Sequence, residues 1–161
     1  MDQQKIQQFG DELYEAMVKR EAVSPLTSRG EDISIEDAYH ISLRMLERRQ
    51  QAGARVIGKK IGVTSKAVMN MLNVHQPDFG YLTDDMVFNS GEAVPISDRL
   101  IAPRAEGEIA FILKKDLSGP GITNADVLAA TECVMPCFEI VDSRIQDWKI
   151  AIQDTIADNA S

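Results

Sequence analysis

The hydrophobic periodicity of the chain changes at residue 54, and this change restricts the possible folds more than any other feature. Before residue 54, apolar residues recur at helical spacing, and after it short apolar runs alternate with turn residues. Helices at one end of a chain and strands at the other are typical of an α+β protein. The sequence therefore predicts an α+β fold, with a helical region over residues 1–53 and a sheet-rich domain over residues 54–161.

Two amphipathic helices are expected in the N-terminal region. The first covers residues 4–20 and carries an apolar stripe at Ile6, Phe9, Leu13 and Met17. The second begins at Ser34, where Asp37 completes a variant capping box, and ends at Gly53. We interpret both helices as packing elements.

Short elements are expected after residue 54. Strands are predicted over residues 55–62, 105–113 and 134–141, and helices over residues 65–72 and about 124–131. Residues 73–81 are rich in polar residues, Pro and Gly, and are predicted as a loop. Asn89-Ser90-Gly91 predicts a hairpin turn between residues 86–88 and 92–94.

Charge and composition exclude several kinds of partner. With 17 basic and 25 acidic residues, the net charge of −8 argues against nucleic acid and against an anionic membrane. No apolar run approaches the roughly 18 residues that a membrane span needs. The polar N-terminus lacks the pattern of a signal peptide, and two cysteines are too few for a disulfide scaffold. We therefore expect a cytoplasmic protein.

Three glutamates in strand-like segments form a candidate metal site. Glu106 and Glu108 alternate along one predicted strand, so they share a face, with Cα atoms roughly 6.5–7 Å apart. That face could simply be solvated, but the strand continues into apolar residues, so neither face is expected to stay in water. Glu139 is flanked by apolar residues, and burying it unpaired would cost several kcal/mol. Three carboxylates suit Mg²⁺ or Mn²⁺ better than zinc.

A basic segment and one loop aspartate are candidates for substrate binding and proton transfer. Residues 54–66 hold four basic residues and no acidic one, which favours a small anionic ligand, although lysines also protect edge strands. Lys60 alternates with Lys59 and is expected on the opposite face of its strand. Asp78 is either an acid or base, or only a turn residue in Pro-Asp-Phe-Gly.

Several motifs in this order resemble one enzyme family. They are Gly58-Lys59-Lys60-Ile61-Gly62, Gln76-Pro77-Asp78-Phe79-Gly80-Tyr81-Leu82, Pro103-Arg104-Ala105-Glu106-Gly107-Glu108, Glu139-Ile140-Val141-Asp142-Ser143-Arg144 and Ala157-Asp158-Asn159-Ala160-Ser161. Together they resemble the 2-keto-4-pentenoate hydratases of aromatic meta-cleavage pathways, also called 2-hydroxypenta-2,4-dienoate hydratases. These belong to the hydratase and decarboxylase branch of the fumarylacetoacetate-hydrolase superfamily.

The resemblance implies a role for each candidate residue. Glu106, Glu108 and Glu139 correspond to the family's ligands for Mg²⁺ or Mn²⁺. Lys60 and Asp78 correspond to its groups for proton transfer and orientation, and Lys60 and Ser161 to substrate-binding positions.

The resemblance also implies a fold and an activity. The fold is part of a mixed β-roll, incomplete because family members continue beyond the position of Ser161. The activity is that of a hydro-lyase that adds water to 2-hydroxypenta-2,4-dienoate, giving 4-hydroxy-2-oxopentanoate. The alternatives are 4-oxalocrotonate decarboxylase, or an inactive fragment that binds only metal or a partner subunit. The implied partners are a small anionic dienoate, further copies of the chain and the pathway decarboxylase.

Overall fold

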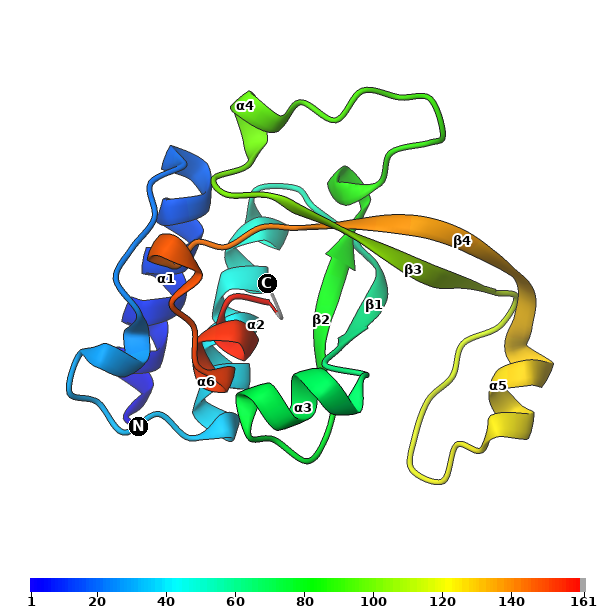
Figure 1. Cartoon of the computed structure of the whole chain (residues 1–161), viewed down its shortest axis with the longest axis horizontal. Coiled ribbons are helices and arrows are strands. Elements are labelled where there is room, and N and C mark those ends of the chain that lie inside the picture. Colours follow the sequence, from blue (N-terminus) through cyan, green and yellow to red (C-terminus); the bar gives the residue numbers. More distant parts are fainter. Residues whose placement is uncertain (160–161) are drawn as a thin grey trace. The chain divides into compact units, whose positions relative to one another are not determined.

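The computed structural model describes residues 1–159, except for the side chains of residues 71 and 72 (Figure 1). Its main elements, in chain order, are α1 (Gln3–Lys19), α2 (Ile35–Gln51), β1 (Val56–Gly62), α3 (Lys66–Leu72), β2 (Asp78–Thr83), α4 (Ile96–Arg99), β3 (Arg104–Leu113), α5 (Asn124–Ala130), β4 (Thr131–Val141) and α6 (Ile152–Ala157). Short 3₁₀ turns occupy Leu26–Ser28, Asp84–Met86 and Gln146–Trp148. Long helices come first and sheets follow, which confirms the α+β class. No helix among the described residues has both the length and the apolar character needed to cross a membrane.

The chain divides into two compact units. Unit 1 combines residues 1–103 with the segment that begins at Asp142, and unit 2 consists of Arg104–Val141. The segment after Asp142 packs with residues 1–103 although it is distant in the sequence. The units therefore do not meet at residue 53. The two domains expected on either side of residue 53 stay a prediction.

The two long helices of unit 1 lie within one or two residues of their predicted bounds. The Asp2 side chain accepts a hydrogen bond from the Lys5 amide and caps α1, and Arg20 closes that helix in the left-handed conformation. At α2, the Ser34 and Asp37 side chains bond reciprocally to each other's backbone amides, which confirms the capping box.

One apolar cluster holds unit 1 together. It joins α1, α2, the turn Leu26–Ser28 and α6, and consists of Phe9, Leu13, Leu26, Ile33, Ala38, Ile41, Met45, Ile145, Ile156 and Ala157. Burying such side chains contributes about 1.5–3 kcal/mol each for the larger ones. The N-terminal helices are therefore packing elements, as the sequence indicates.

A fully buried carboxylate connects α6 to the N-terminal part of unit 1. Asp154 accepts hydrogen bonds from the amides of Leu26 and Thr27, the Thr27 hydroxyl and the Ala151 amide. Since α6 has only six residues, it is too short to be stable by itself and depends on these contacts and on the core.

Strands β1 and β2 form an antiparallel sheet in unit 1, and this corrects one prediction. Residues 78–81 belong to β2, whereas the sequence predicted a loop over 73–81. Pairing with β1, more than fifteen positions away along the chain, overrides the local turn signals of Pro77 and Gly80.

The predicted hairpin around residue 90 is also wrong. The turn itself is present, because the Glu92 amide donates to the Asn89 carbonyl at 3.0 Å. However, residues 87–95 form neither helix nor strand, and the Glu92 carboxylate accepts the Asn89 amide at 2.6 Å. The Glu92 side chain thus binds the Asn89 amide, which in a hairpin would donate to a backbone carbonyl of the partner strand.

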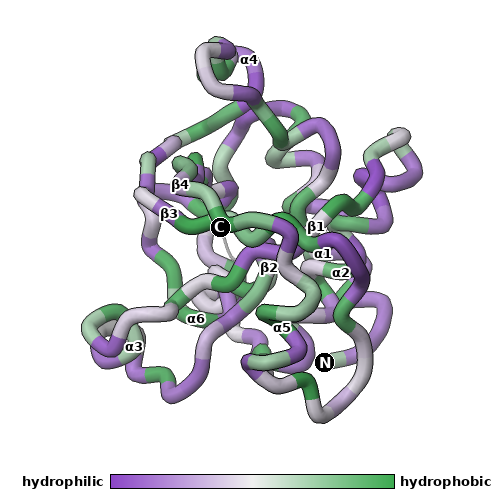
Figure 2. Tube along the Cα trace, turned by 90° about the vertical axis from the view of Figure 1, so that its right-hand side faces the viewer, coloured by the Kyte–Doolittle hydropathy of each residue, from purple (hydrophilic) through white to green (hydrophobic). Residues whose placement is uncertain are grey.

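Unit 2 is built on the antiparallel pair of β3 and β4, with α5 leading into β4. Strand β4 begins at Thr131, three residues earlier than predicted. Along β3 the charged residues Arg104, Glu106 and Glu108 are followed by the apolar residues 109–113. The hydropathy of each residue along the chain is drawn in Figure 2. The expectation that neither face of this strand stays in water is wrong for the described residues, since Ile109 on one face is 64% exposed and Ile112 on the other is 45% exposed.

Candidate active site

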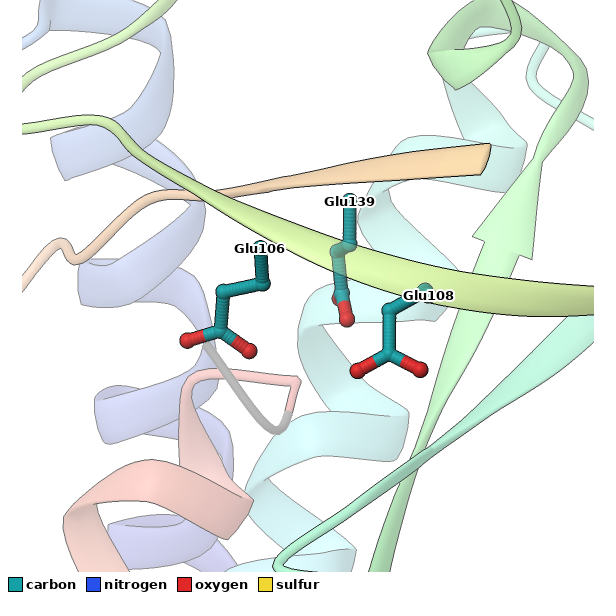
Figure 3. A group of neighbouring side chains, drawn as sticks. All are labelled: Glu106, Glu108 and Glu139. Atoms are coloured by element: carbon teal, nitrogen blue, oxygen red, sulfur yellow. The ribbon is translucent and has the colours of Figure 1, made fainter. Parts of the chain in front are cut away.

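The β3–β4 pair brings the three candidate glutamates together. Glu106 lies directly opposite Glu139 in the strand register, and Glu108 is the next residue on the same face of β3. Directly opposite Cβ atoms of an antiparallel pair are about 4.5–5.5 Å apart, which places these side chains in reach of one another. One carboxylate oxygen of each glutamate lies within 4.8 Å of the others, and all three carboxyl groups point to the same side of the strand pair (Figure 3).

The chemistry of this cluster fits a hard divalent cation. Three carboxylates at this separation repel one another, and like charges directly across a strand pair are destabilising. Oxygen ligands from carboxylates are those that Mg²⁺ and Mn²⁺ prefer. Glu106 and Glu108 are exposed and Glu139 is half-buried, so the donor set is accessible to an ion from solution.

Lys59 and Lys60 point to opposite faces of the β1–β2 sheet. Lys59 pairs with Tyr81, and its ammonium lies 5.3 Å and 5.4 Å from the ring centres of Phe79 and Tyr81. Those contacts give Lys59 a cation–π role on the face of the sheet that carries Phe79 and Tyr81. Lys60 pairs with Gly80 and is half-buried on the other face, as its alternation with Lys59 predicts.

Asp78 lies on the same face of the sheet as Lys60. It pairs with Gly62 and is only 3% exposed. A Cβ atom placed on Gly62 would be 2.3 Å from Asp78 Oδ1, so the carboxyl group lies directly over that glycine. Gly62 therefore makes room for an acidic group on the face of the sheet that carries Lys60.

The sequence did not indicate the buried polar network that follows β4. The Asp158 carboxylate accepts hydrogen bonds from the Arg144 amide at 2.9 Å and from the Arg144 guanidinium. Burial raises the pKa of Asp158, and the charge of Arg144 opposes that shift. Asp142 accepts the amides of Ile101 and Ala102 at 3.0 Å and 2.7 Å. These residues lie in the motifs Glu-Ile-Val-Asp-Ser-Arg and Ala-Asp-Asn-Ala-Ser, but no local spacing rule pairs an aspartate with an arginine fourteen positions away.

The candidate residues thus form two groups. Glu106, Glu108 and Glu139 belong to unit 2, whereas Lys60 and Asp78 belong to unit 1. Ser161, the expected substrate-binding position, lies outside the described residues.

Known proteins of similar sequence identify the family. The chain is 82% identical over its whole length to the 2-hydroxypent-2,4-dienoate hydratase of Pseudomonas putida, and it covers 72% of that protein. It belongs to this hydratase family. It is also 65% identical to the 2-hydroxyhexa-2,4-dienoate hydratase of Comamonas testosteroni and 44% identical to a 2-keto-4-pentenoate hydratase of Paraburkholderia xenovorans. The chain spans 61% and 60% of those two relatives. No protein-family model matches the chain.

A solved structure shows the same fold. The 4-oxalocrotonate decarboxylase from Pseudomonas putida G7, complexed with magnesium and adipate, matches the whole chain with a TM-score of 0.94 at 30% identity. The chain covers 61% of that protein. A second structure of the decarboxylase, complexed with calcium and acetate, matches with a TM-score of 0.91. The chain therefore has the fold of this part of the hydratase and decarboxylase group.

Proposed function

We propose that this chain carries the metal-binding and proton-transfer residues of a hydratase that converts 2-hydroxypenta-2,4-dienoate to 4-hydroxy-2-oxopentanoate in the breakdown of aromatic compounds. The observation that carries the proposal is the convergence of Glu106, Glu108 and Glu139 within 4.8 Å, in a chain 82% identical to a hydratase of that dienoate. The magnesium in the related decarboxylase supports a divalent cation, Mg²⁺ or Mn²⁺, at these glutamates.

The glutamates and the β1–β2 residues have separate tasks in this proposal. The cation held by the glutamates would supply Lewis-acid stabilisation of negative charge on the carboxylate and 2-oxygen of the substrate. Lys60 Nζ and the Asp78 carboxyl group share the proton transfers and the orientation of water.

The protons balance over two steps. In the first, the dienol loses its 2-hydroxyl proton and gains a proton on its terminal carbon, which gives the 2-oxo-3-ene. In the second, water adds across the remaining C=C bond, with hydroxyl on C4 and hydrogen on C3. Two groups that can each hold a proton, one basic and one acidic, are sufficient for both transfers, and Lys60 and Asp78 lie on one face of one sheet.

Sequence identity favours the hydratase over the decarboxylase. The decarboxylase matches this chain at 30% identity, whereas the hydratases match it at 39–82%. The two reactions both need stabilisation of an enolate, so a shared fold and metal site do not separate them. The product separates them, since decarboxylation releases CO₂ and hydration does not.

The test is an absorbance assay on the dienol, generated enzymatically just before use. Mixing it with the chain and Mg²⁺ is expected to deplete the dienol absorbance, and removing Mg²⁺ with a chelator is expected to stop the depletion. The Pseudomonas putida relative serves as the positive control. If the relative depletes the dienol and the chain binds Mn²⁺ without depleting it, the chain is a metal-binding piece and not an enzyme by itself. CO₂ release from 2-oxo-hex-3-enedioate would identify a decarboxylase instead.

The cellular compartment and the protein partners that we propose come from the same family resemblance. We propose a cytoplasmic homo-oligomer that works beside the pathway decarboxylase, which would supply its dienol. The free thiols of Cys133 and Cys137 are consistent with a reducing compartment. Sedimentation of the chain alone and mixed with the decarboxylase tests both associations.

A further inference from the structure

Asn159 connects the segment after α6 to the middle of β2. Its side-chain amide donates to the Tyr81 carbonyl at 3.0 Å, and its side-chain oxygen accepts the Tyr81 amide at 2.8 Å. The side chain therefore satisfies both backbone groups of one strand residue, as a neighbouring strand would. Asn159 has a φ of 66°, a left-handed conformation that asparagine tolerates better than most residues.

The backbone of Asn159 lies over Gly80, beside Lys60. A Cβ atom placed on Gly80 would be 2.2 Å from the Asn159 carbonyl oxygen and 3.2 Å from Lys60 Cγ. Any larger residue at position 80 would have to displace one of them. Since Lys60 pairs with Gly80 across the sheet, the Asn159 carbonyl covers the same glycine against which the stem of Lys60 packs.

Buried hydrogen bonds fix the residues before Asn159, and they restrict where Asn159 can lie. Asp158 is fully buried, and its carboxylate and carbonyl oxygens accept bonds from Arg144. Helix α6, which ends just before Asp158, is attached through Asp154 to the Leu26 and Thr27 amides. These contacts hold the residues before Asn159 against the core. Among the described residues, Asn159 then joins this segment to β2 through its two hydrogen bonds to Tyr81.

We propose that Asn159 is a positioning residue for Lys60. By fastening its own segment to Tyr81, it keeps that segment over Gly80 and thereby restricts the Lys60 side chain to one orientation on the sheet. The effect of this restraint on catalysis rests on the proposed function. The restraint itself does not depend on whether the chain turns over a dienoate. Asn159 touches β2 and not the reacting atoms in this assignment.

The direct test measures the reactivity of single lysines. The chain is acetylated with limiting acetic anhydride, which transfers an acetyl group to a neutral amine and releases acetate, and each lysine is quantified by mass spectrometry. The ratio of Lys60 to Lys66 acetylation is compared among the wild type, Asn159→Ala and Gly80→Ala. Lys66 is exposed at the start of α3 and serves as the reference within each sample.

Both variants are expected to raise the ratio several-fold, since one removes the attachment to Tyr81 and the other pushes the segment off Gly80. Asp2→Ala is the matched control, because it removes the hydrogen bond that caps α1 and lowers the stability of unit 1 outside the contacts that hold Asn159. It is expected to leave the ratio unchanged. An unchanged ratio in both Asn159→Ala and Gly80→Ala, with a lower melting temperature, would show that Asn159 is only structural.

The catalytic consequence has its own readout. In the dienol assay, Asn159→Ala is expected to lower kcat while KM stays near the wild-type value, since the variant misplaces a proton-transfer group and leaves the metal ligands intact. A raised Lys60 ratio in a chain without hydratase activity would refute the proposed function and retain the positioning role. Hydratase activity with an unaltered ratio and kcat would refute the positioning role and retain the function.

Discussion

Asp154 offers the sharpest test of how unit 1 is held together. Its side chain is fully buried and accepts four hydrogen bonds, two on each oxygen. Three of the donors are backbone amides, which cannot rotate to find another acceptor. The carboxylate therefore joins the turn at Leu26 to the first turn of α6, and the position of Asn159 depends on that helix.

The cost of replacing Asp154 follows from its partners. In Asp154→Asn the remaining oxygen keeps the Leu26 and Thr27 amides, the new amide donates to the Thr27 hydroxyl, and the Ala151 amide loses its acceptor. One buried donor without a partner costs about 1–3 kcal/mol, and exchanging a charged for a neutral acceptor weakens the remaining bonds by roughly 1 kcal/mol. We expect a loss of about 2–4 kcal/mol for Asp154→Asn and about 4–5 kcal/mol for Asp154→Ala.

Thermal and urea unfolding measure these losses. The single tryptophan, Trp148, lies in unit 1, where its indole donates to the Ala102 carbonyl, so its fluorescence reports on this unit. Asp154→Asn is expected to lower the melting temperature by roughly 10 °C. Thr27→Val, which removes only the hydroxyl donor, should cost about 1 kcal/mol and give the smallest shift of the series. A loss below about 1 kcal/mol for Asp154→Asn would refute the reasoning.

Three further variants test the site and its surroundings. Glu108→Gln is expected to weaken calorimetric Mn²⁺ binding by at least tenfold, because it removes one of three charged ligands, and unchanged affinity would mean that the glutamates are structural. Gly62→Ala is expected to lower hydratase kcat by displacing the Asp78 carboxyl, whereas Gly58→Ala, whose nearest neighbour would be 3.7 Å away, should be tolerated. The Ser34 hydroxyl and the N-terminal ammonium hold the pKa of Asp37 at about 2, so its stabilising effect is complete above the unfolded-state value near 3.9 and is lost as the pH falls through 2. Acid unfolding of Asp37→Asn should accordingly depend less on pH between 4 and 2 than that of the wild type, and parallel curves would contradict this origin of the shift.

Local sequence patterns predicted what local interactions determine. The capping box of Ser34 and Asp37 and the apolar stripe of the first helix need only neighbouring residues, and both are present. The shared face of Glu106 and Glu108 follows from strand alternation, and their approach to Glu139 needs only the pairing of two neighbouring strands. The metal role of these glutamates and the roles of Lys60 and Asp78 stay predictions.

What the sequence could not show depends on contacts between distant segments. Strand β2 reads as a loop because Pro77 and Gly80 are turn formers, and only its pairing with β1 and the approach of Asn159 explain a glycine inside a strand. The Arg144 and Asp158 pair likewise has no local signature. Pairing over long separations is the information that periodicity lacks.

The candidate site departs from the usual residue preferences of β-strands. Glutamate is depleted in strands, and opposing Glu106 to Glu139 places like charges across a pair that would be more stable with neutral residues. A similar departure occurs in unit 1, where Gly62 and Gly80 give up strand propensity and make space for Asp78 and for the Asn159 segment. Gly10, inside α1, is an exception with a packing cause, because a Cβ atom there would be 2.5 Å from Arg44 Cβ. The glutamate cluster has no such packing cause, since neutral residues would pair more stably across the two strands, and it is therefore the departure that fits a ligand-binding role best.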